Sequence, residues 1–156
     1  MGGHYLVLLV VDDPLQAESA RLAAAQACPE IDLSAVAGYA VLDWIGSSLR
    51  EKQPLPHIIL LDLQLPKLDG LAVLRKLRSL PATGEIPIVV FSAEYTQPEV
   101  LMSYKAGANS FVAKPADVAG YAEIFRERLA YWMPQPPGLF SPAGIGSGGT
   151  DLTPPH

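Results

Sequence analysis

Five stretches of the chain are rich in apolar residues and have the length of β-strands. The stretch that ends at Asp62 has four consecutive aliphatic residues, two of them β-branched, which is typical of a strand buried on both faces of a parallel sheet. Residues 31–37 instead alternate between apolar and polar, as expected near the edge of a sheet. The pattern predicts strands at 5–11, 31–37, 58–62, 86–91 and 110–113.

Each predicted strand is followed by a segment with helical character. Pro14 suits a first helical turn, and Asp117 can cap the last helix. Thr96 and Glu99 have the spacing of a capping box, and Gly107 suits a C-terminal cap. The predicted helices cover 14–27, 41–49, 70–79, 96–107 and 117–132. The last helix has an apolar stripe that should face the sheet, made of Tyr121, Ile124, Phe125, Leu129 and Trp132.

This alternation of strands and helices predicts an α/β fold. Right-handed crossovers then produce a doubly wound parallel sheet that is covered on both sides. The strand at 31–37 is the weakest and belongs at an edge, whereas the strands at 5–11 and 58–62 belong in the middle. This placement favours a flavodoxin-like five-stranded sheet of order 2-1-3-4-5, with five helices.

The composition changes abruptly after residue 132. Residues 133–156 contain six proline and five glycine residues, a single acidic residue and no hydrophobic periodicity. Such a segment cannot bury enough apolar surface to offset the entropy lost on ordering, so we expect a disordered tail or a docking strip. The folded domain is predicted to span residues 1–132.

Composition also indicates the cellular compartment of the protein and the kinds of partner it can bind. The chain has 156 residues, a net charge of -5 and one cysteine, Cys28, which favours a reducing, cytoplasmic setting over secretion. No apolar stretch is long enough to cross a membrane. We interpret the basic residues Arg75, Lys76 and Arg78 as one solvated helix face. Neither nucleic acid nor a membrane is therefore an expected partner.

Polar and charged residues stand where the predicted strands end. Asp12 and Asp13 follow the first strand, Asp62 the third, Ser92 the fourth and Lys114 the fifth. In parallel α/β sheets these ends meet at one edge, where ligands bind. Three neighbouring carboxylates repel one another unless a cation lies between them, and Mg²⁺ prefers oxygen ligands. With a lysine and a hydroxyl opposite, the set predicts phosphoryl transfer, with Asp62 as the nucleophile.

A series of short motifs carries these residues in order along the chain. They are Val10-Val11-Asp12-Asp13, Leu60-Leu61-Asp62, Leu65-Pro66, Asp69-Gly70, Ser92-Ala93, Ala106-Gly107-Ala108 and Lys114-Pro115. Together they resemble the receiver domain of two-component response regulators, which has the chemotaxis-regulator fold. The likeness covers about residues 5 to 132.

The resemblance implies a magnesium site. Asp13 and Asp62 would bind Mg²⁺ together with the backbone carbonyl of Gln64. Asp12 would act mainly through a water bound to the ion. The side chains of Gln64 and Glu94 lie beside this site and should modulate how fast water removes the phosphoryl group.

The resemblance also implies the course of the reaction. Asp62 would take a phosphoryl group from a phosphohistidine of a sensor histidine kinase, and Ser92 and Lys114 would each contact one of its oxygens. The chain would be an enzyme only in catalysing its own phosphorylation and dephosphorylation. The Lys114-Pro115 peptide is expected to be cis. Phe111 stands at the position of the family's switch aromatic and would turn inward when Ser92 moves toward the phosphoryl group.

A narrower likeness concerns the partners. Residues 130–134, Ala-Tyr-Trp-Met-Pro, resemble the aromatic end of single-domain regulators that work with phytochrome-type histidine kinases. This likeness implies a homodimer formed through the last two helices and the last strand. The output would be protein contact, or relay to a histidine phosphotransfer protein.

Other interpretations of the same residues stay open. An aspartyl-nucleophile phosphatase generally needs a second aspartate where Gln64 stands, and also a cap domain. A flavodoxin-type flavin protein needs a Ser/Thr/Gly-rich phosphate loop where Asp12 and Asp13 stand. A receiver-like module that binds proteins without being phosphorylated is a further alternative. Taken alone, Asp12 and Asp13 would be an ordinary charge pair at a helix start, and Phe111 a core aromatic.

Overall fold

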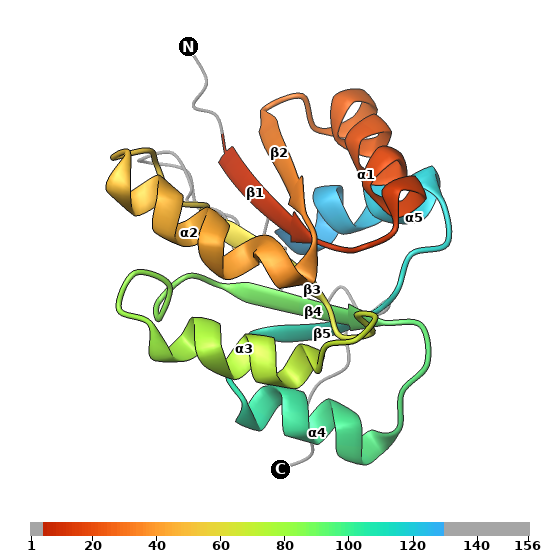
Figure 1. Ribbon diagram of the computed structural model, residues 1–156. Coiled ribbons are helices and arrows are strands. Elements are labelled where there is room, and N and C mark those ends of the chain that lie inside the picture. Colours follow the sequence, from red (N-terminus) through yellow and green to blue (C-terminus); the bar gives the residue numbers. More distant parts are fainter. Residues whose placement is uncertain (1–4, 130–156) are drawn as a thin grey trace, which may run out of the picture.

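The computed structural model describes residues 5–129 and confirms the predicted fold (Figure 1). The described part contains a five-stranded parallel sheet of order β2-β1-β3-β4-β5. Its strands are β1 (Tyr5–Val10), β2 (Ile31–Val36), β3 (Ile58–Asp62), β4 (Ile88–Ser92) and β5 (Ser110–Ala113). The helices are α1 (Pro14–Ala27), α2 (Val41–Arg50), α3 (Gly70–Ser79), α4 (Gln97–Lys105) and α5 (Val118–Glu123). A 3₁₀ turn, η1 (Gly38–Ala40), precedes α2, and a π-helical segment, η2 (Ile124–Leu129), continues α5.

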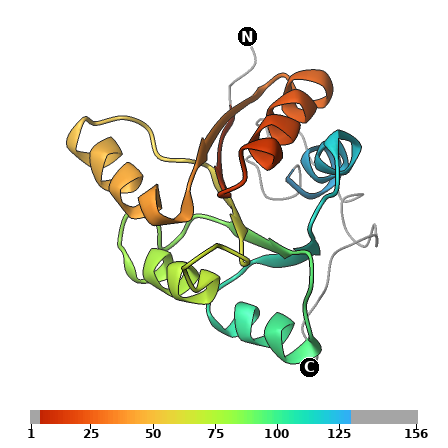
Figure 2. The ribbon, with the colours of Figure 1, turned by 45° about the vertical axis from the view of Figure 1, so that its right-hand side comes forward.

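Two layers of helices cover the two faces of the sheet (Figures 1 and 2). Helices α1 and α5 lie side by side on one face, and α2, α3 and α4 lie on the other. Successive residues of β1 alternate between the two cores, so that Leu9 faces the α1–α5 side and Leu8 the α2–α4 side. Every residue of β3 and β4 is buried, as the continuous apolar runs predict.

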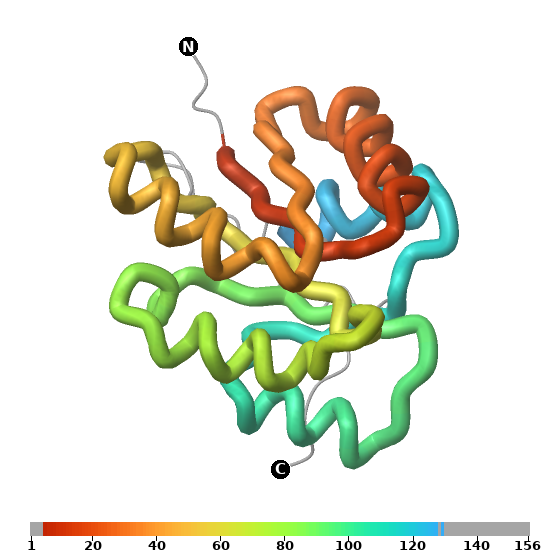
Figure 3. The backbone as a smooth tube through the Cα atoms, viewed as in Figure 1, coloured from red at the N-terminus to blue at the C-terminus, as the bar shows by residue number. Residues whose placement is uncertain are grey.

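All strands run in the same direction, which determines where their ends lie. The backbone trace shows that the loops after β1, β3, β4 and β5 meet at one edge of the sheet (Figure 3). The helices return the chain to the opposite edge, where each following strand begins. The predicted functional residues are therefore collected at the carboxyl edge by topology.

Helix α1 packs on the sheet through small side chains. Its buried residues are Ala17, Ala20, Ala23 and Ala24. The two leucines a heptad apart point to solvent, with Leu15 76% and Leu22 43% exposed. Alanine packing brings α1 close to the sheet and to α5.

Arg78 corrects one sequence-based prediction. Arg75 and Lys76 are exposed, as expected for a solvated face, but Arg78 is half-buried. Its guanidinium donates to the carbonyl oxygens of Gly107 at 2.8 Å and Ile86 at 2.7 Å. It also donates to Asn109 Oδ1 at 2.6 Å and, over longer distances, to the carbonyls of Thr83 and Gly84. Burial lowers the pKa of this guanidinium, and the charge of Glu85 opposes that shift.

The structure tests several local predictions. Thr96 and Glu99 form the capping box, and Asp117 caps α5. The buried stripe of the last helix is confirmed for Tyr121, Ile124, Phe125 and Leu129, whereas Trp132 lies outside the described residues. The expectation of a cis Lys114-Pro115 peptide is wrong. Every peptide bond in the described part is trans, the isomer favoured even before proline.

Two segments carry predictions that stay untested. Residues 130–134, with the aromatic motif, and residues 133–156, with the predicted tail, lie outside the described residues. Between residues 5 and 129, no helix has both the length and the apolar character needed to span a bilayer.

A methyl group is expected to destabilise the domain at Gly70 and to stabilise it at Gly46. A Cβ at Gly70 would lie 2.4 Å from the carbonyl oxygen of Leu63, so the β3–α3 backbone would have to move. At Gly46, inside α2, a Cβ would meet only Nη1 of Arg50, at 3.3 Å. We expect the free energy of unfolding to fall by about 2 kcal/mol in Gly70→Ala and to rise by about 0.5–1 kcal/mol in Gly46→Ala. Urea unfolding measures both, and equal midpoints would contradict the packing described.

Candidate functional site

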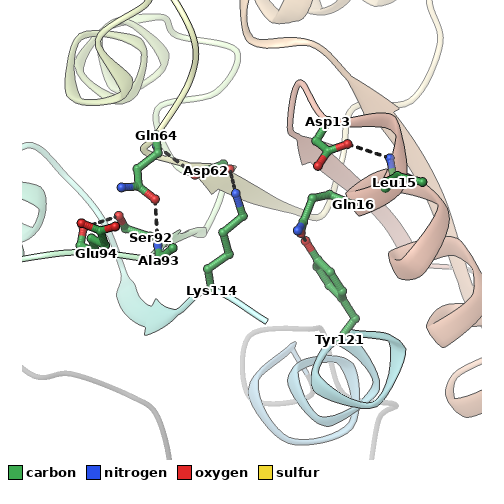
Figure 4. A network of polar contacts seen from close by, with 10 residues as sticks. All are labelled: Asp13, Leu15, Gln16, Asp62, Gln64, Ser92, Ala93, Glu94, Lys114 and Tyr121. Carbon is green, nitrogen blue, oxygen red and sulfur yellow. Dashed lines mark hydrogen bonds and ion pairs between the residues drawn. The ribbon is translucent and has the colours of Figure 1, made fainter. Parts of the chain in front are cut away.

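Asp62 is the buried centre of the carboxyl edge. It is the last residue of β3, and only 3% of its surface is exposed. Lys114 Nζ lies 2.7 Å from its Oδ2 and forms an ion pair with it (Figure 4). The backbone N–H of Gln64 donates to Oδ1 at 2.8 Å. The predicted nucleophile therefore has both oxygens held by donors from the chain.

Lys114 reaches Asp62 across the intervening strand β4. It follows β5, and its backbone N–H donates to the carbonyl oxygen of Ser92 at 3.0 Å. Because β4 lies between β3 and β5, the side chain crosses the end of β4 to reach the carboxylate. The third and fifth strand ends, which were predicted to meet at this edge, thus lie together, and the ion pair joins them directly.

The two acids after β1 lie at the same edge but are oriented differently. Asp12 is half-buried, and its Oδ1 accepts from the N–H of Gly38 at 2.7 Å. Asp13 is exposed and caps α1, with Oδ1 accepting from the N–H of Leu15 at 2.9 Å. Neither hydrogen bond uses the second carboxylate oxygen, so each acid keeps a lone-pair donor for a further ligand.

Tyr121 lies near the acids of two strand ends, Asp62 and Asp13. Its hydroxyl donates to Gln16 Oε1, which joins α5 to the first turn of α1 (Figure 4). Burial is the main cause that raises the pKa of this phenol, and the charges of Asp62 and Asp13 raise it further. The hydroxyl thus lies within the field of both carboxylates. Neither Gln16 nor this use of Tyr121 was predicted, because the sequence does not show how α1 faces α5.

The hydroxyl of Ser92 does not bind Asp62 in this structure. Ser92 is the last residue of β4 and is 3% exposed. Its Oγ donates to the carbonyl oxygen of Glu94 at 2.8 Å, along its own loop. The side chain of Gln64 crosses to the same loop, where Oε1 accepts from the N–H of Ala93 at 2.9 Å (Figure 4). Gln64 therefore joins the β3–α3 and β4–α4 loops, a contact that the sequence did not predict.

Phe111 is fully buried in β5, on the α4 side of the sheet. Its ring packs edge-on against Tyr95, with ring centroids 5.1 Å apart. Both rings line a hollow of about 120 Å³ that also contacts Ser92, Gln64 and Glu99. The ring already points inward here, and its role as a switch stays a prediction.

The carboxyl edge has an excess of negative charge. Asp12, Asp13 and Asp62 contribute three carboxylates, and among the described residues only Lys114 forms an ion pair with any of them. Hard oxygen donors with uncompensated charge fit a divalent cation such as Mg²⁺. Within residues 5–129, no three acidic, histidine or cysteine side chains already converge as a metal-binding group. The donor set thus fits the ion chemically, and the aspartates would have to turn from their present hydrogen bonds toward it.

The sequence of the chain matches that of known proteins. Residues 7–125 match the model of the response regulator receiver domain. The response regulator Rcp1 of Synechocystis is 31% identical over 83 residues, or 53% of this chain and 56% of Rcp1. The probable methanogenesis regulatory protein FilR2 of Methanothrix harundinacea is 30% identical over 96 residues, or 62% of each protein. The matched part therefore spans less than two thirds of these relatives.

Solved structures of similar proteins agree with the fold. The phosphorylated cyanobacterial phytochrome response regulator RcpA has a TM-score of 0.73 and 26% identity, covering 83% of this chain and 94% of its own. The Mn²⁺-bound form of Rcp1 has a TM-score of 0.67 and 25% identity, covering 89% and 99%. These neighbours confirm the likeness to phytochrome-associated regulators. Since the family model covers most of the chain, this protein belongs to the response regulator receiver domain family of two-component signalling.

Proposed function

We propose that this receiver domain accepts a phosphoryl group on Asp62 from a sensor histidine kinase and signals through protein contact. The observation that supports the proposal is the ion pair between Lys114 and the buried Asp62 at the end of β3. The Asp62 carboxylate is held at a strand end, with the Lys114 ammonium group 2.7 Å away. The positive charge of that ammonium group can stabilise the oxygens of an incoming phosphoryl group.

In this proposal Asp62 acts as the nucleophile. The bond between phosphorus and the histidine nitrogen of the kinase breaks, a bond forms between phosphorus and a carboxylate oxygen, and the imidazole takes up a proton. Lys114 then pairs with an oxygen of the phosphoryl group, and Ser92 turns from Glu94 to donate to another. Apart from this self-phosphorylation and the later hydrolysis of the aspartyl phosphate, which releases inorganic phosphate and restores the Asp62 carboxylate, we assign no enzymatic activity to the chain.

The proposed metal ligands come from two strand ends. Asp13 and Asp62, with the backbone carbonyl of Gln64, would hold Mg²⁺, and Asp12 would contact it through water. The ion would neutralise negative charge on the phosphoryl oxygens during transfer. Rcp1, a relative of this chain, has been solved in a Mn²⁺-bound form, which supports a divalent cation here.

The proposed partners follow from the relatives. A phytochrome-type histidine kinase is the proposed donor, because RcpA is a phytochrome response regulator. We propose a homodimer through the last two helices and the last strand, and a histidine phosphotransfer protein as an alternative acceptor. The negative charge of the chain is consistent with a cytoplasmic protein partner rather than nucleic acid.

Asp13→Asn is expected to weaken Mg²⁺ binding by about 10-fold or more and to slow phosphorylation by acetyl phosphate in proportion. Asparagine keeps the cap of α1 but removes the negative charge. Asp69→Asn is the matched control, because Asp69 is also an exposed helix cap and accepts from the N–H of Leu71 at 3.0 Å. Calorimetric titration with Mg²⁺ measures the effect. Equal affinities for the two variants would remove Asp13 from the proposed metal site.

A further inference from the structure

An apolar groove lies between α2 and the end of α3, away from the carboxyl edge. It has a volume of about 420 Å³. Its lining includes Leu42, Ile45, Gly46 and Leu49 of α2, facing Leu80 and Pro81 after α3. The four α2 residues are spaced i, i+3, i+4 and i+7, so they form one continuous stripe along the helix.

The exposed part of this stripe lies beside the face of α2 that packs on the sheet. Val41 and Ile45 are buried in the core of the α2–α4 side. Leu42 and Leu49, by contrast, are 38% and 52% exposed. Leucines at this spacing, rather than polar residues, are what a helix presents to a partner that covers it.

Gly46 keeps the floor of the groove open. A glycine inside a helix is about 1 kcal/mol less favourable than alanine. No backbone packing within the described domain requires it, because a Cβ would meet only Nη1 at the end of the Arg50 side chain, at 3.3 Å. Gly46 therefore contributes no side chain to the floor of the groove, which leaves its volume open.

We propose that Leu139 and Phe140, in the segment of the same chain that follows the described domain, occupy this groove. The described domain ends in the helix layer on the opposite face of the sheet from the groove. Helix α5 and η2 follow β5 and run back from the carboxyl edge (Figure 3), so the described chain ends on the way toward the edge where the strands begin. Burial and the charge of Glu30 raise the pKa of the Cys28 thiol, just before β2, and the charge of Arg126 opposes this rise, which places Arg126 near that end of β2.

The groove opens at that same edge. Leu49 stands near the end of α2, and Leu80 and Pro81 lie between α3 and β4, where the chain turns back into the sheet. A chain leaving η2 has to pass only around the edge of the sheet, from one helix layer to the other. With helices about 10 Å in diameter on both faces, this path is about 20 Å.

The intervening chain is long enough for that path. Leu139 is ten positions after Leu129, and an extended chain over ten positions spans about 30 Å. Pro134, Pro136 and Pro137 favour an extended backbone, which lowers the entropy lost on docking.

The composition of residues 133–156 indicates that Leu139 and Phe140 are the side chains that dock. Leu139 and Phe140 are the only adjacent large apolar side chains among residues 133–156. The segment has no lysine or arginine and one acidic residue, so burial of these two side chains is its main means of binding. This docking does not depend on phosphorylation of Asp62.

The test compares two matched pairs of double variants in the full chain by ¹⁵N nuclear magnetic resonance. Leu139→Ser/Phe140→Ser is expected to shift the amide signals of residues 42–49 and 80–82, whereas Ile145→Ser/Leu152→Ser leaves them in place. On the groove side, Leu42→Lys/Leu49→Lys is expected to abolish the slow tumbling of residues 139–140. Leu15→Lys/Leu22→Lys, the same heptad spacing on exposed leucines of α1, leaves it unchanged.

Two results would overturn the proposal. If residues 139–140 tumble freely in the wild type and the groove signals do not respond to their replacement, the segment does not dock. If the amide signals of residues 42–49 and 80–82 depend on protein concentration and light scattering gives twice the chain mass, a second copy of the chain occupies the groove instead. Thermal unfolding of all four variants checks that the domain stays folded, which the exposure of the replaced leucines leads us to expect.

Discussion

Lys114→Met is expected to slow phosphorylation by acetyl phosphate about 100-fold, because removal of one preorganised charge at a reacting oxygen typically has an effect of this size. Lys114 Nζ lies 2.7 Å from Asp62 Oδ2, and no other cation pairs with Asp62 among the described residues. Methionine keeps the apolar stem that crosses the end of β4 but cannot neutralise an oxygen of the incoming group. The rate of phosphoryl uptake at saturating Mg²⁺ measures the loss.

Lys105→Met is the control for overall charge. Lys105 is exposed in the last turn of α4 and makes no ion pair in the described part of the chain. Its loss changes the net charge equally but removes nothing from the site, so the rate should stay within about twofold of the wild type. A Lys114→Met variant that reacts as fast as Lys105→Met would disprove the proposed role of the ammonium group.

Arg78→Met is expected to lower the free energy of unfolding by about 3 kcal/mol, the sum of several lost bonds to a charged donor. The guanidinium joins α3 to the loop before β4 and to the loop before β5. Without it, carbonyl oxygens from Gly107 and Ile86 lose their donor within the protein. Position 107 favours glycine for two reasons. Its φ is +116°, and an added Cβ would lie only 2.4 Å from Arg78 Cγ.

Two further variants in α3 show whether the loss of stability comes from the hydrogen bonds of Arg78. Arg75→Met, on the exposed face of α3, should change the stability by less than about 0.5 kcal/mol. Arg78→Lys should give an intermediate loss, because an ammonium group cannot span acceptors that a planar guanidinium reaches together. Urea unfolding at constant pH compares the three. Similar midpoints for Arg75→Met and Arg78→Met would show that these hydrogen bonds contribute little.

The strand ends could be predicted because a parallel sheet leaves little choice. Continuous apolar runs such as the one before Asp62 are strands buried on both faces, and their carboxyl ends meet at one edge. The pairing of Asp62 with Lys114 follows from that topology, although 52 residues separate them. The sheet order was predictable for the same reason, since the alternating pattern of β2 is suited to an edge.

Contacts between loops and helices were not predictable in the same way. The acceptors of Arg78 come from two loops up to 31 residues away, and no local pattern marks them. The sequence therefore favoured a solvated arginine. Likewise, the bond from Tyr121 to Gln16 depends on the rotation of α5 against α1, and the bond from Gln64 to Ala93 on side-chain rotamers. Ser92 was placed correctly at the end of β4, but its present hydrogen bond to Glu94 is a rotamer choice that position does not determine.

The measurement that tests the central claim most directly is the intact mass of the protein after incubation with acetyl phosphate. The samples are the wild type with Mg²⁺, the wild type with a chelator, and Asp62→Asn with Mg²⁺, with Asp69→Asn as a control for the loss of an aspartate at the same edge. The account predicts one added phosphoryl group in the wild type and in Asp69→Asn, and none in the other two samples. A wild type that gains no phosphoryl group, or an Asp62→Asn variant that gains one as the wild type does, would contradict Asp62 as the phosphoryl acceptor.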